Sequence, residues 1–245
     1  MHDILSCSGQ ASPLGPVQSP SVSAVGIKRP TTALIPFVMV EIWSDVVCPW
    51  CYIGKANLSK ALEDFPGDVE VVYRSFQLDP GAPEEPRSQI DYLGERYGGG
   101  REQALAMTRQ VTEVAARAGL DFHLEDTQAG QTIDAHRLLH LAADRGVQGV
   151  LAERLFAAHF TEQRSIFDEQ SLIALAVEAG LESSEVTDVL ASDRYLDAVR
   201  ADIEQAQAFG ATGVPFFVID RAYAVSGAQP PEVFLDILEQ VRSGQ

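Results

Sequence analysis

The sequence predicts an α/β fold in which a strand–helix–strand unit and a strand–strand–helix unit flank a long block of helices. Two short β-rich stretches, residues 38–43 and 69–76, are separated by a segment with helical spacing. Residues 89–209 are almost wholly helical in pattern, and two more β-rich stretches precede a last helical stretch. This order places the helical block between the second and third strands of one sheet.

The first β-rich stretch is short, β-branched and aromatic, which is typical of a buried strand. After it, apolar residues recur at helical spacing from Ile53 to Phe65, and Pro66–Gly67 ends the run. Residues 69–76 form the predicted second strand. Because a helix connects the two strands, we expect them to lie parallel.

A proline-rich loop, residues 78–87, leads into the helical block, where recurrent glycines predict six or seven helices. Thr132, Asp168 and Ser192 are residue types that cap helices, and each precedes a helical pattern. Beyond the block we expect strands at 216–220 and 223–226 and a helix at 231–241. The predicted insertion is residues 88–210, and it interrupts a discontinuous core of residues 39–87 and 211–245.

Composition excludes several classes of function. The chain has 245 residues and a formal net charge of −17, which argues against nucleic acid, because proteins bind that polyanion through clustered Lys and Arg. No apolar run approaches the roughly 18 residues of a membrane span, so no membrane role is predicted. Hydrophobic residues make up 46%, enough for a chain of this length to fold without disulfides.

Residues 1–38 are rich in Ser, Pro, Gly and Ala, lack periodicity and contain Cys7, so we predict a disordered N-terminal extension. Its basic pair, Lys28–Arg29, comes late and is followed by Pro30, which does not match a secretory signal. The folded part is expected to begin at Met39. A cytoplasmic location follows as a prediction.

The other two cysteines form a Cys48-Pro49-Trp50-Cys51 motif at the junction between the first strand and the first helix. This spacing lets one thiolate attack a substrate disulfide while the other resolves the mixed disulfide. A cysteine at a helix N-terminus faces unpaired N–H groups, which favour thiolate. Cys48 is therefore the predicted exposed nucleophile and Cys51 the more buried resolving residue, and Pro49 suits the first helical position.

Two other interpretations of the cysteine pair are half of a zinc site and unreactive core residues. Zinc needs about four ligands, and the five histidines are dispersed. His136 and His140 are four residues apart on one predicted helix, so a Cys₂His₂ site is conceivable. A C-x-x-C beside a strand–helix–strand pattern favours redox chemistry, and no metal is predicted.

Three segments, residues 41–55, 134–140 and 213–220, resemble the FrnE group of DsbA-like oxidoreductases in the thioredoxin superfamily. The similarity covers residues 39–242. It implies a thioredoxin fold with a large all-helical insertion between the second and third core strands. Related architectures are the 2-hydroxychromene-2-carboxylate isomerases and the kappa-class glutathione transferases, which bind glutathione and usually have serine where Cys48 stands.

The resemblance also implies roles for single residues. Pro215, which base rates alone would make a trans proline, is expected to be cis and to pack against the cysteine pair. The main chain of Val214 is expected to bind an extended substrate, with Pro49 and Trp50 as further substrate contacts. Asp45 and Glu41 are the two candidates for a buried proton acceptor, whereas core packing or helix contacts are expected of His136 and His140.

The function predicted from these residues is a protein-disulfide oxidoreductase of the reductase or isomerase type. It has a redox-active disulfide, Cys48–Cys51, and no bound cofactor. Its expected partners are peptides and proteins that carry thiols or disulfides, and glutathione is an open candidate for co-substrate. The alternatives are a glutathione-dependent isomerase or transferase acting on a small molecule, and an interaction module switched by the redox state of the pair.

Overall fold

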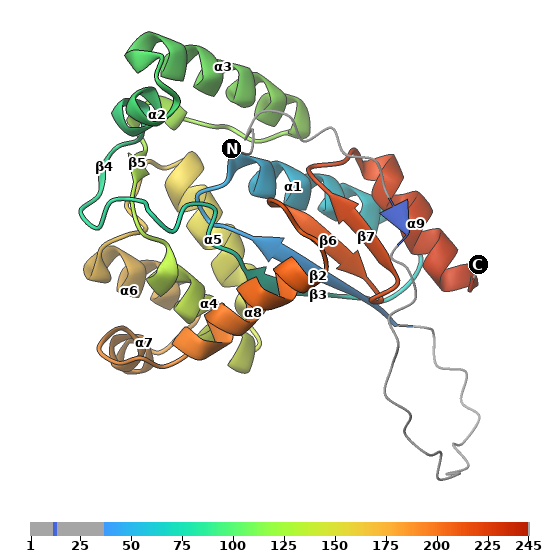
Figure 1. Ribbon diagram of the computed structural model, residues 1–245. Coiled ribbons are helices and arrows are strands. Elements are labelled where there is room, and N and C mark those ends of the chain that lie inside the picture. Colours follow the sequence, from blue (N-terminus) through green and yellow to red (C-terminus); the bar gives the residue numbers. More distant parts are fainter. Residues whose placement is uncertain (1–11, 14–36, 245) are drawn as a thin grey trace.

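The computed structural model describes residues 12–13 and 37–244 (Figure 1). The predicted disordered extension, residues 1–38, lies outside the described residues except for its last two positions and Ser12–Pro13, a two-residue strand labelled β1. No helix in the described part of the chain combines the length and the apolar character needed to cross a bilayer.

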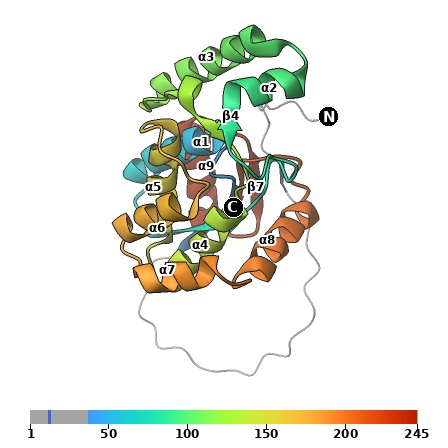
Figure 2. The ribbon, with the colours of Figure 1, turned by 90° about the vertical axis from the view of Figure 1, so that its left-hand side faces the viewer.

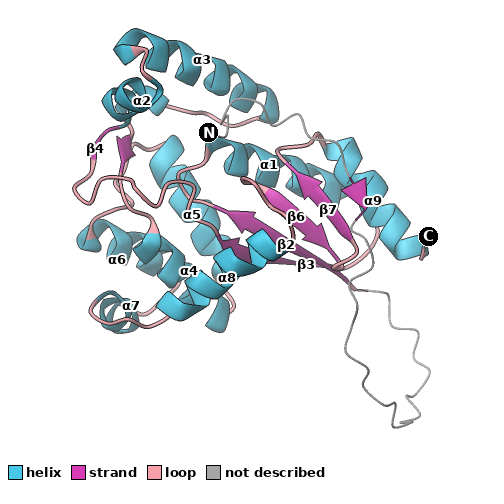
Figure 3. Cartoon of the chain, in the orientation of Figure 1, coloured by secondary structure: helices cyan, strands magenta, loops and turns pink. Residues whose placement is uncertain are grey.

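A mixed sheet of five strands, in the order β1-β7-β6-β2-β3, forms the centre of the molecule (Figure 3). Strand β2 (Val38–Ser44) runs parallel to β3 (Val69–Ser75), as predicted for strands connected by a helix. On its other side β2 pairs antiparallel with β6 (Phe216–Ile219), which pairs antiparallel with β7 (Tyr223–Ser226). Residues far apart in sequence therefore meet at the end of β2.

Helices cover both faces of this sheet. Helix α1 (Pro49–Asp64) packs beside α9 (Pro231–Ser243) on one face, and α8 (Leu196–Ala208) lies on the other (Figures 1 and 2). The α8 face is anchored by Trp43, whose indole Nε1 donates a hydrogen bond to the carbonyl of Asp202 at 2.7 Å. On the α9 face, Phe217 and Phe234 meet edge to face with ring centroids 4.7 Å apart.

The insertion between β3 and β6 is helical, as expected. Its remaining helices are α2 (Gln89–Tyr97), α3 (Gly100–Ala118), α4 (Ile133–Asp144), α5 (Gln148–Phe160), α6 (Glu169–Glu178) and α7 (Ser183–Leu190). Helices α4 to α7 gather on one side, whereas α2 and α3 form a separate hairpin near the start of α1 (Figure 1). This α/β architecture confirms the predicted fold class.

Two local predictions fail for identifiable reasons. Ser192 does not begin α8, because its hydroxyl donates to the carbonyl of Asp188 at 2.6 Å and so ends α7 instead; α8 begins after Tyr195. Arg87, assigned to the proline-rich loop, starts the two-residue strand β4 (Arg87–Ser88), which pairs with β5 (Gln128–Ala129). Asp168 caps α6 as predicted, accepting from the Ser171 N–H at 2.9 Å.

Candidate functional site

The two cysteines lie at the start of α1, just after β2 ends. Cys48 is the residue before the helix, Pro49 is its first residue, and the N–H of Cys51 donates to the Cys48 carbonyl at 3.0 Å. The N–H of Cys48 donates in turn to the carbonyl of Asp45 at 3.0 Å. Both side chains are free thiols. The turn from Asp45 to Cys51 is therefore fixed by its own main chain.

Cys48 was predicted to be exposed, and that prediction is wrong. Only 1% of Cys48 is accessible, the same fraction as for Cys51. The Cys48 Sγ lies 3.6 Å from the carbonyl oxygen of Val214, to which the thiol donates. The loop before β6 therefore covers the sulfur in this dithiol form.

Cys51 has a pKa well above its usual range, first because it is buried and then because of the hydrogen bond and the charge of neighbouring Cys48. The hydroxyl of Ser44 and a main-chain hydrogen bond with Asp45 act in the opposite direction, since they favour the thiolate. Cys51 is accordingly a thiol at neutral pH. A thiolate forms there only with help from its surroundings.

The Val214–Pro215 peptide bond is cis, as the resemblance implies. Its loop lies against α1 at Gly54: a methyl group built on this glycine would stand 3.1 Å from Pro215 Cγ and 3.1 Å from Phe217 Cζ. The missing side chain thus allows the helix that carries the cysteines to approach the proline loop closely.

The two candidate proton acceptors occupy different places. Asp45 is 1% exposed; its carboxylate accepts from the Leu78 N–H at 2.8 Å and lies 3.3 Å from His136 Nε2. Glu41, fully buried, accepts from Arg74 at 2.7 Å and from Arg221 at 3.0 Å. Two guanidinium groups therefore hold the Glu41 carboxylate, whereas the main chain of Asp45 is hydrogen-bonded to Cys48.

His136 and His140, which sequence reasoning considered as zinc ligands, have separate partners. His140 Nε2 lies 3.1 Å from the Asp202 carboxylate and 3.2 Å from the Ser75 hydroxyl, whereas His136 faces Asp45. Among the residues that the structure describes, no three His, Cys, Asp or Glu side chains are grouped as metal ligands.

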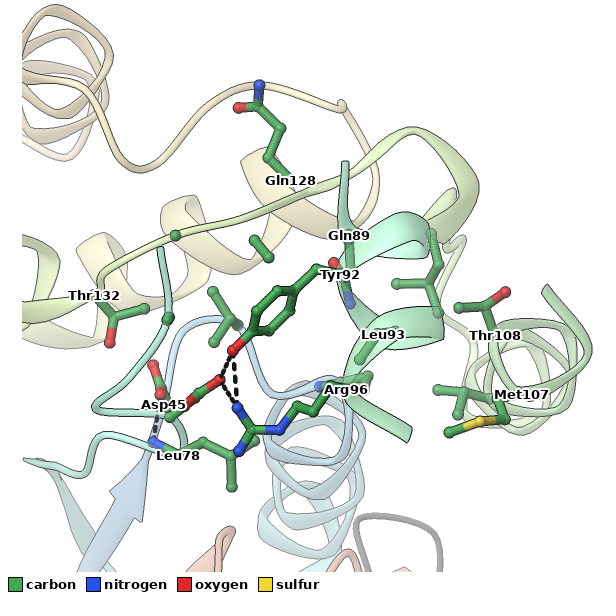
Figure 4. Close-up of a pocket in the computed structure, with 18 of the residues that line it drawn as sticks. Asp45, Leu78, Gln89, Tyr92, Leu93, Arg96, Met107, Thr108, Gln128 and Thr132 are labelled. Carbon is green, nitrogen blue, oxygen red and sulfur yellow. Dashed lines mark hydrogen bonds and ion pairs between the residues drawn. The ribbon is translucent and has the colours of Figure 1, made fainter. Parts of the chain in front are cut away.

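A pocket opens beside Pro49 and Trp50, between the cysteine motif and the α2–α3 hairpin (Figure 4). It encloses about 940 Å³ of space, part of it open to solvent, and its wall is largely apolar, with Leu93 and Met107 on the hairpin side. The indole Nε1 of Trp50 is buried and has no hydrogen-bond partner within the described part of the chain.

An ion pair that sequence reasoning missed forms part of the polar wall of this pocket. Arg96 and Tyr92, both on α2, donate to the carboxylate of Asp79, and Arg96 also donates to the Tyr92 hydroxyl at 2.8 Å (Figure 4). Partial burial raises the pKa of Asp79, but the hydrogen bonds from Arg96 and Tyr92 and the charge of Arg96 together hold it below its usual range. These residues lie far from the cysteines in sequence, so no motif spacing indicated them.

Comparison with known proteins agrees with this geometry. The family model described as "DSBA-like thioredoxin domain" matches residues 39–239. A structure of a probable DsbA oxidoreductase from Streptomyces coelicolor is 48% identical, covers 85% of this chain and 91% of its own, and superposes with a TM-score of 0.79. The uncharacterized protein YwbO of Bacillus subtilis is 28% identical and covers 80% of this chain and 94% of its own.

A more distant structure shares the fold. It is the cytosolic disulfide reductase DsbM from Pseudomonas aeruginosa with GSH, which is 21% identical, covers 83% of this chain and 99% of its own, and has a TM-score of 0.60.

Proposed function

This chain belongs to the DSBA-like thioredoxin domain family, and from that premise we propose that it is a thiol-disulfide oxidoreductase that reduces or isomerises disulfides in peptides and proteins. One observation carries the proposal. Cys48 precedes the first residue of α1 with its sulfur 3.6 Å from the Val214 carbonyl, and Cys51 follows one helical turn later. A nucleophile, a resolving thiol and a substrate-binding main chain are thereby brought together.

The proposed reaction has two exchange steps. The Cys48 thiolate attacks one sulfur of the substrate disulfide, forms a mixed disulfide and releases the first substrate sulfur as a thiolate, which takes up a proton. Cys51 then attacks Cys48 Sγ, so that the Cys48–Cys51 disulfide forms and the second substrate sulfur leaves as a thiol. The enzyme dithiol loses two electrons and the substrate disulfide gains them. A separate reductant, for which glutathione is the candidate, returns the pair to the dithiol; no bound cofactor is needed.

The substrate contacts we propose are the main chain of Val214 and the side chains of Pro49 and Trp50. Because the Cys48 thiol donates to the Val214 carbonyl, an extended peptide that pairs with residue 214 would bring its disulfide to the sulfur. The pocket beside Pro49 and Trp50 offers an apolar surface for the group next to the reacting cysteine.

Asp45 is the proposed proton acceptor for Cys51, since it is buried and its main chain contacts both cysteines. Reduction or isomerisation is the proposed direction, for a cytoplasmic enzyme whose compartment keeps thiols reduced. The disulfide reductase DsbM, described as cytosolic, supports this only through its shared fold.

The first test is the reduction potential of the Cys48–Cys51 pair, measured by equilibrating the protein with glutathione buffers. Cys7 is replaced by serine throughout, so that it takes no part in exchange. We expect one two-electron transition between about −280 and −120 mV, and its loss in Cys48→Ser. A pair that forms no reversible disulfide would refute the proposal.

The pocket favours a second candidate, a glutathione-dependent isomerase or transferase for a small molecule. Its largely apolar wall and its position beside the motif suit a compact organic substrate. Cys48→Ser separates the two functions: it abolishes disulfide exchange, whereas an isomerase or transferase that uses the thiol of bound glutathione keeps its turnover. Full activity of Cys48→Ser on a glutathione-linked substrate would favour this second function.

A further inference from the structure

We propose that His136, in the helical insertion, is a positioning residue for the step in which Cys51 resolves the mixed disulfide, and that it acts through Asp45. The inference rests on the proposed function, because it concerns the second exchange step. It assigns to the insertion a part in the chemistry of the thioredoxin-like core, through the contact of His136 with Asp45.

His136, on α4, contacts Asp45 in the turn that carries the cysteines. Both His136 and Asp45 are 1% exposed, and His136 Nε2 lies 3.3 Å from Asp45 Oδ1. The other carboxylate oxygen, Oδ2, accepts from the Leu78 N–H at 2.8 Å. One buried carboxylate is thus held from two sides, by the insertion and by the loop that follows β3. Both oxygens need a donor there, because an unpaired buried carboxylate is costly.

The main chain of Asp45 extends this constraint to both cysteines. Its carbonyl accepts from the Cys48 N–H at 3.0 Å, and a main-chain hydrogen bond with Asp45 favours the thiolate of Cys51. A change in the main-chain torsions of Asp45, which the held carboxylate opposes, would displace that hydrogen bond. Since burial opposes ionisation of Cys51, the few groups that favour its thiolate decide how fast it resolves a mixed disulfide.

The second nitrogen of His136 indicates which tautomer is present. His136 Nδ1 is buried without a hydrogen-bond partner within the described residues. An imidazole with its proton on Nε2 donates to Asp45 and leaves Nδ1 as an unprotonated acceptor, which avoids burying an unpaired N–H. The Nε2–H tautomer therefore fits both observations.

The step affected is the second exchange. In the mixed disulfide, Cys51 loses its proton, its sulfur bonds to Cys48 Sγ, and the bond between Cys48 and the substrate breaks. The electron pair of that bond leaves with the substrate sulfur, which takes up the proton and departs as a thiol. We expect His136 to accelerate this step and to leave the first attack by Cys48 nearly unchanged.

Three variants test the inference in Cys7→Ser protein, by rapid mixing with a disulfide-bonded peptide and trapping of the mixed disulfide. His136→Leu removes the donor, and we expect the mixed disulfide to persist about tenfold longer. His136→Gln keeps an N–H that reaches Asp45, and we expect most of the rate to return. His140→Leu, the matched control, removes an imidazole one turn along the same helix, and we expect the wild-type lifetime.

A His136→Leu variant that folds and resolves at the wild-type rate would overturn the inference. So would equal slowing by His140→Leu, which would indicate general disturbance of α4, or a His136→Gln variant as slow as His136→Leu. If His136→Leu does not fold, ¹⁵N shifts of the His136 ring in unsubstituted protein still decide. An Nδ1–H tautomer would contradict the proposed hydrogen bond to Asp45, and an Nε2–H tautomer would support it. Failure of the proposed function itself would give another result in the trapping experiment, because no mixed disulfide would form in any variant or in the wild type.

Discussion

His159 shows what complete burial does to a single titratable residue. It lies on α5 between Phe160 and Phe167, with ring centroids at 4.7 and 5.8 Å, and its Nε2 has no hydrogen-bond partner in the described part of the chain. Burial lowers the pKa of His159 to about 4, although the negative charge of Asp45 acts in the opposite direction. The imidazole is therefore neutral in the folded protein at pH 7.

Because the His159 imidazole is neutral in the folded protein, we expect the protein to lose stability in acid. An unfolded histidine takes up a proton near pH 6.5, whereas folded His159 does so only near pH 4. The contribution to stability is fully present above about pH 6.5 and is lost as the pH falls towards 4, by roughly 3 kcal/mol. Urea unfolding at several pH values should therefore give a shallower decline for His159→Phe than for the wild type.

The control for that experiment is His123→Gln, which replaces a histidine whose side chain is 47% exposed. Carboxylates also titrate in this range, so the informative quantity is the difference between each variant and the wild type at each pH. Parallel curves for His159→Phe and the wild type would show that His159 is not the titrating group.

Cys51 gives a second prediction at the scale of one residue. In a Cys7→Ser, Cys48→Ser protein, alkylation of Cys51 by iodoacetamide should rise about tenfold per pH unit from pH 7 to 9 without a plateau. The reason is that burial is the largest cause of its raised pKa and remains when Cys48 is removed. Cys51→Ser, which leaves the equally buried Cys48, controls for access of the reagent. A plateau below pH 8 would contradict the raised pKa.

At the scale of elements, the contact of α1 with the cis-proline loop depends on Gly54. Gly54→Ala would place a methyl group 3.1 Å from Pro215 and Phe217, so one side must shift, and we expect a loss of about 1 to 3 kcal/mol in the free energy of unfolding. Disulfide exchange should slow as well, because a shift of this loop would move the Val214 carbonyl that contacts Cys48.

The matched control is Gly149→Ala on α5, where a new methyl group meets no atom within 4 Å. There the lower conformational freedom of alanine should leave stability unchanged or raise it by up to about 1 kcal/mol. Chemical denaturation of the two variants compares them directly. Equal changes in the free energy of unfolding would mean that the helix propensity of alanine, and not the close approach to Pro215, causes the effect of Gly54→Ala.

The sequence predicted the elements whose composition or spacing is distinctive. β2 and β3 follow from runs of β-branched and aromatic residues, α1 follows from helical spacing, and the motif placed the cysteines at the start of α1. The paired strands β4 and β5 have two residues each, too few to show a period. The start of α8 was missed because Ser192 ends the preceding helix, and a serine can serve either end.

Only part of the candidate site could be predicted, because the sequence does not tell which of Asp45 and Glu41 lies near the cysteines. Glu41, Trp43 and Arg74 lie on the same face of the sheet, because Trp43 and Arg74 are paired across β2 and β3. Ser44, which has the opposite parity, is the β2 residue that contacts Cys51. Asp45 follows the end of β2, where alternation no longer fixes its direction. Only the register and the turn distinguish Asp45 from Glu41, and neither can be read from a single sequence.

At the scale of the whole molecule, the helical insertion and the sheet share one hydrophobic core. Tyr52 of α1 stacks on Phe156 of α5, with ring centroids 5.0 Å apart. On the other face, Asp202 of α8 accepts from the Trp43 indole at 2.7 Å and from the Ser75 N–H at 2.9 Å. We propose that residues 88–210 form an insertion domain in the topology of the chain, and that this domain depends on packing against the core for its stability.

Shared packing predicts a single cooperative unfolding transition. The chain has two tryptophans, so Trp50→Phe leaves Trp43, on β2, as the fluorescent reporter of the sheet, while far-ultraviolet circular dichroism reports chiefly on the helices of the insertion. In urea the two signals should change at the same midpoint and with the same slope. Near-ultraviolet circular dichroism of the unsubstituted protein controls for the Trp50→Phe change. Two separated midpoints, with the helical signal lost while Trp43 stays buried, would show that the insertion unfolds by itself. The contact of α4 with the cysteine turn would then exist only in the fully folded molecule.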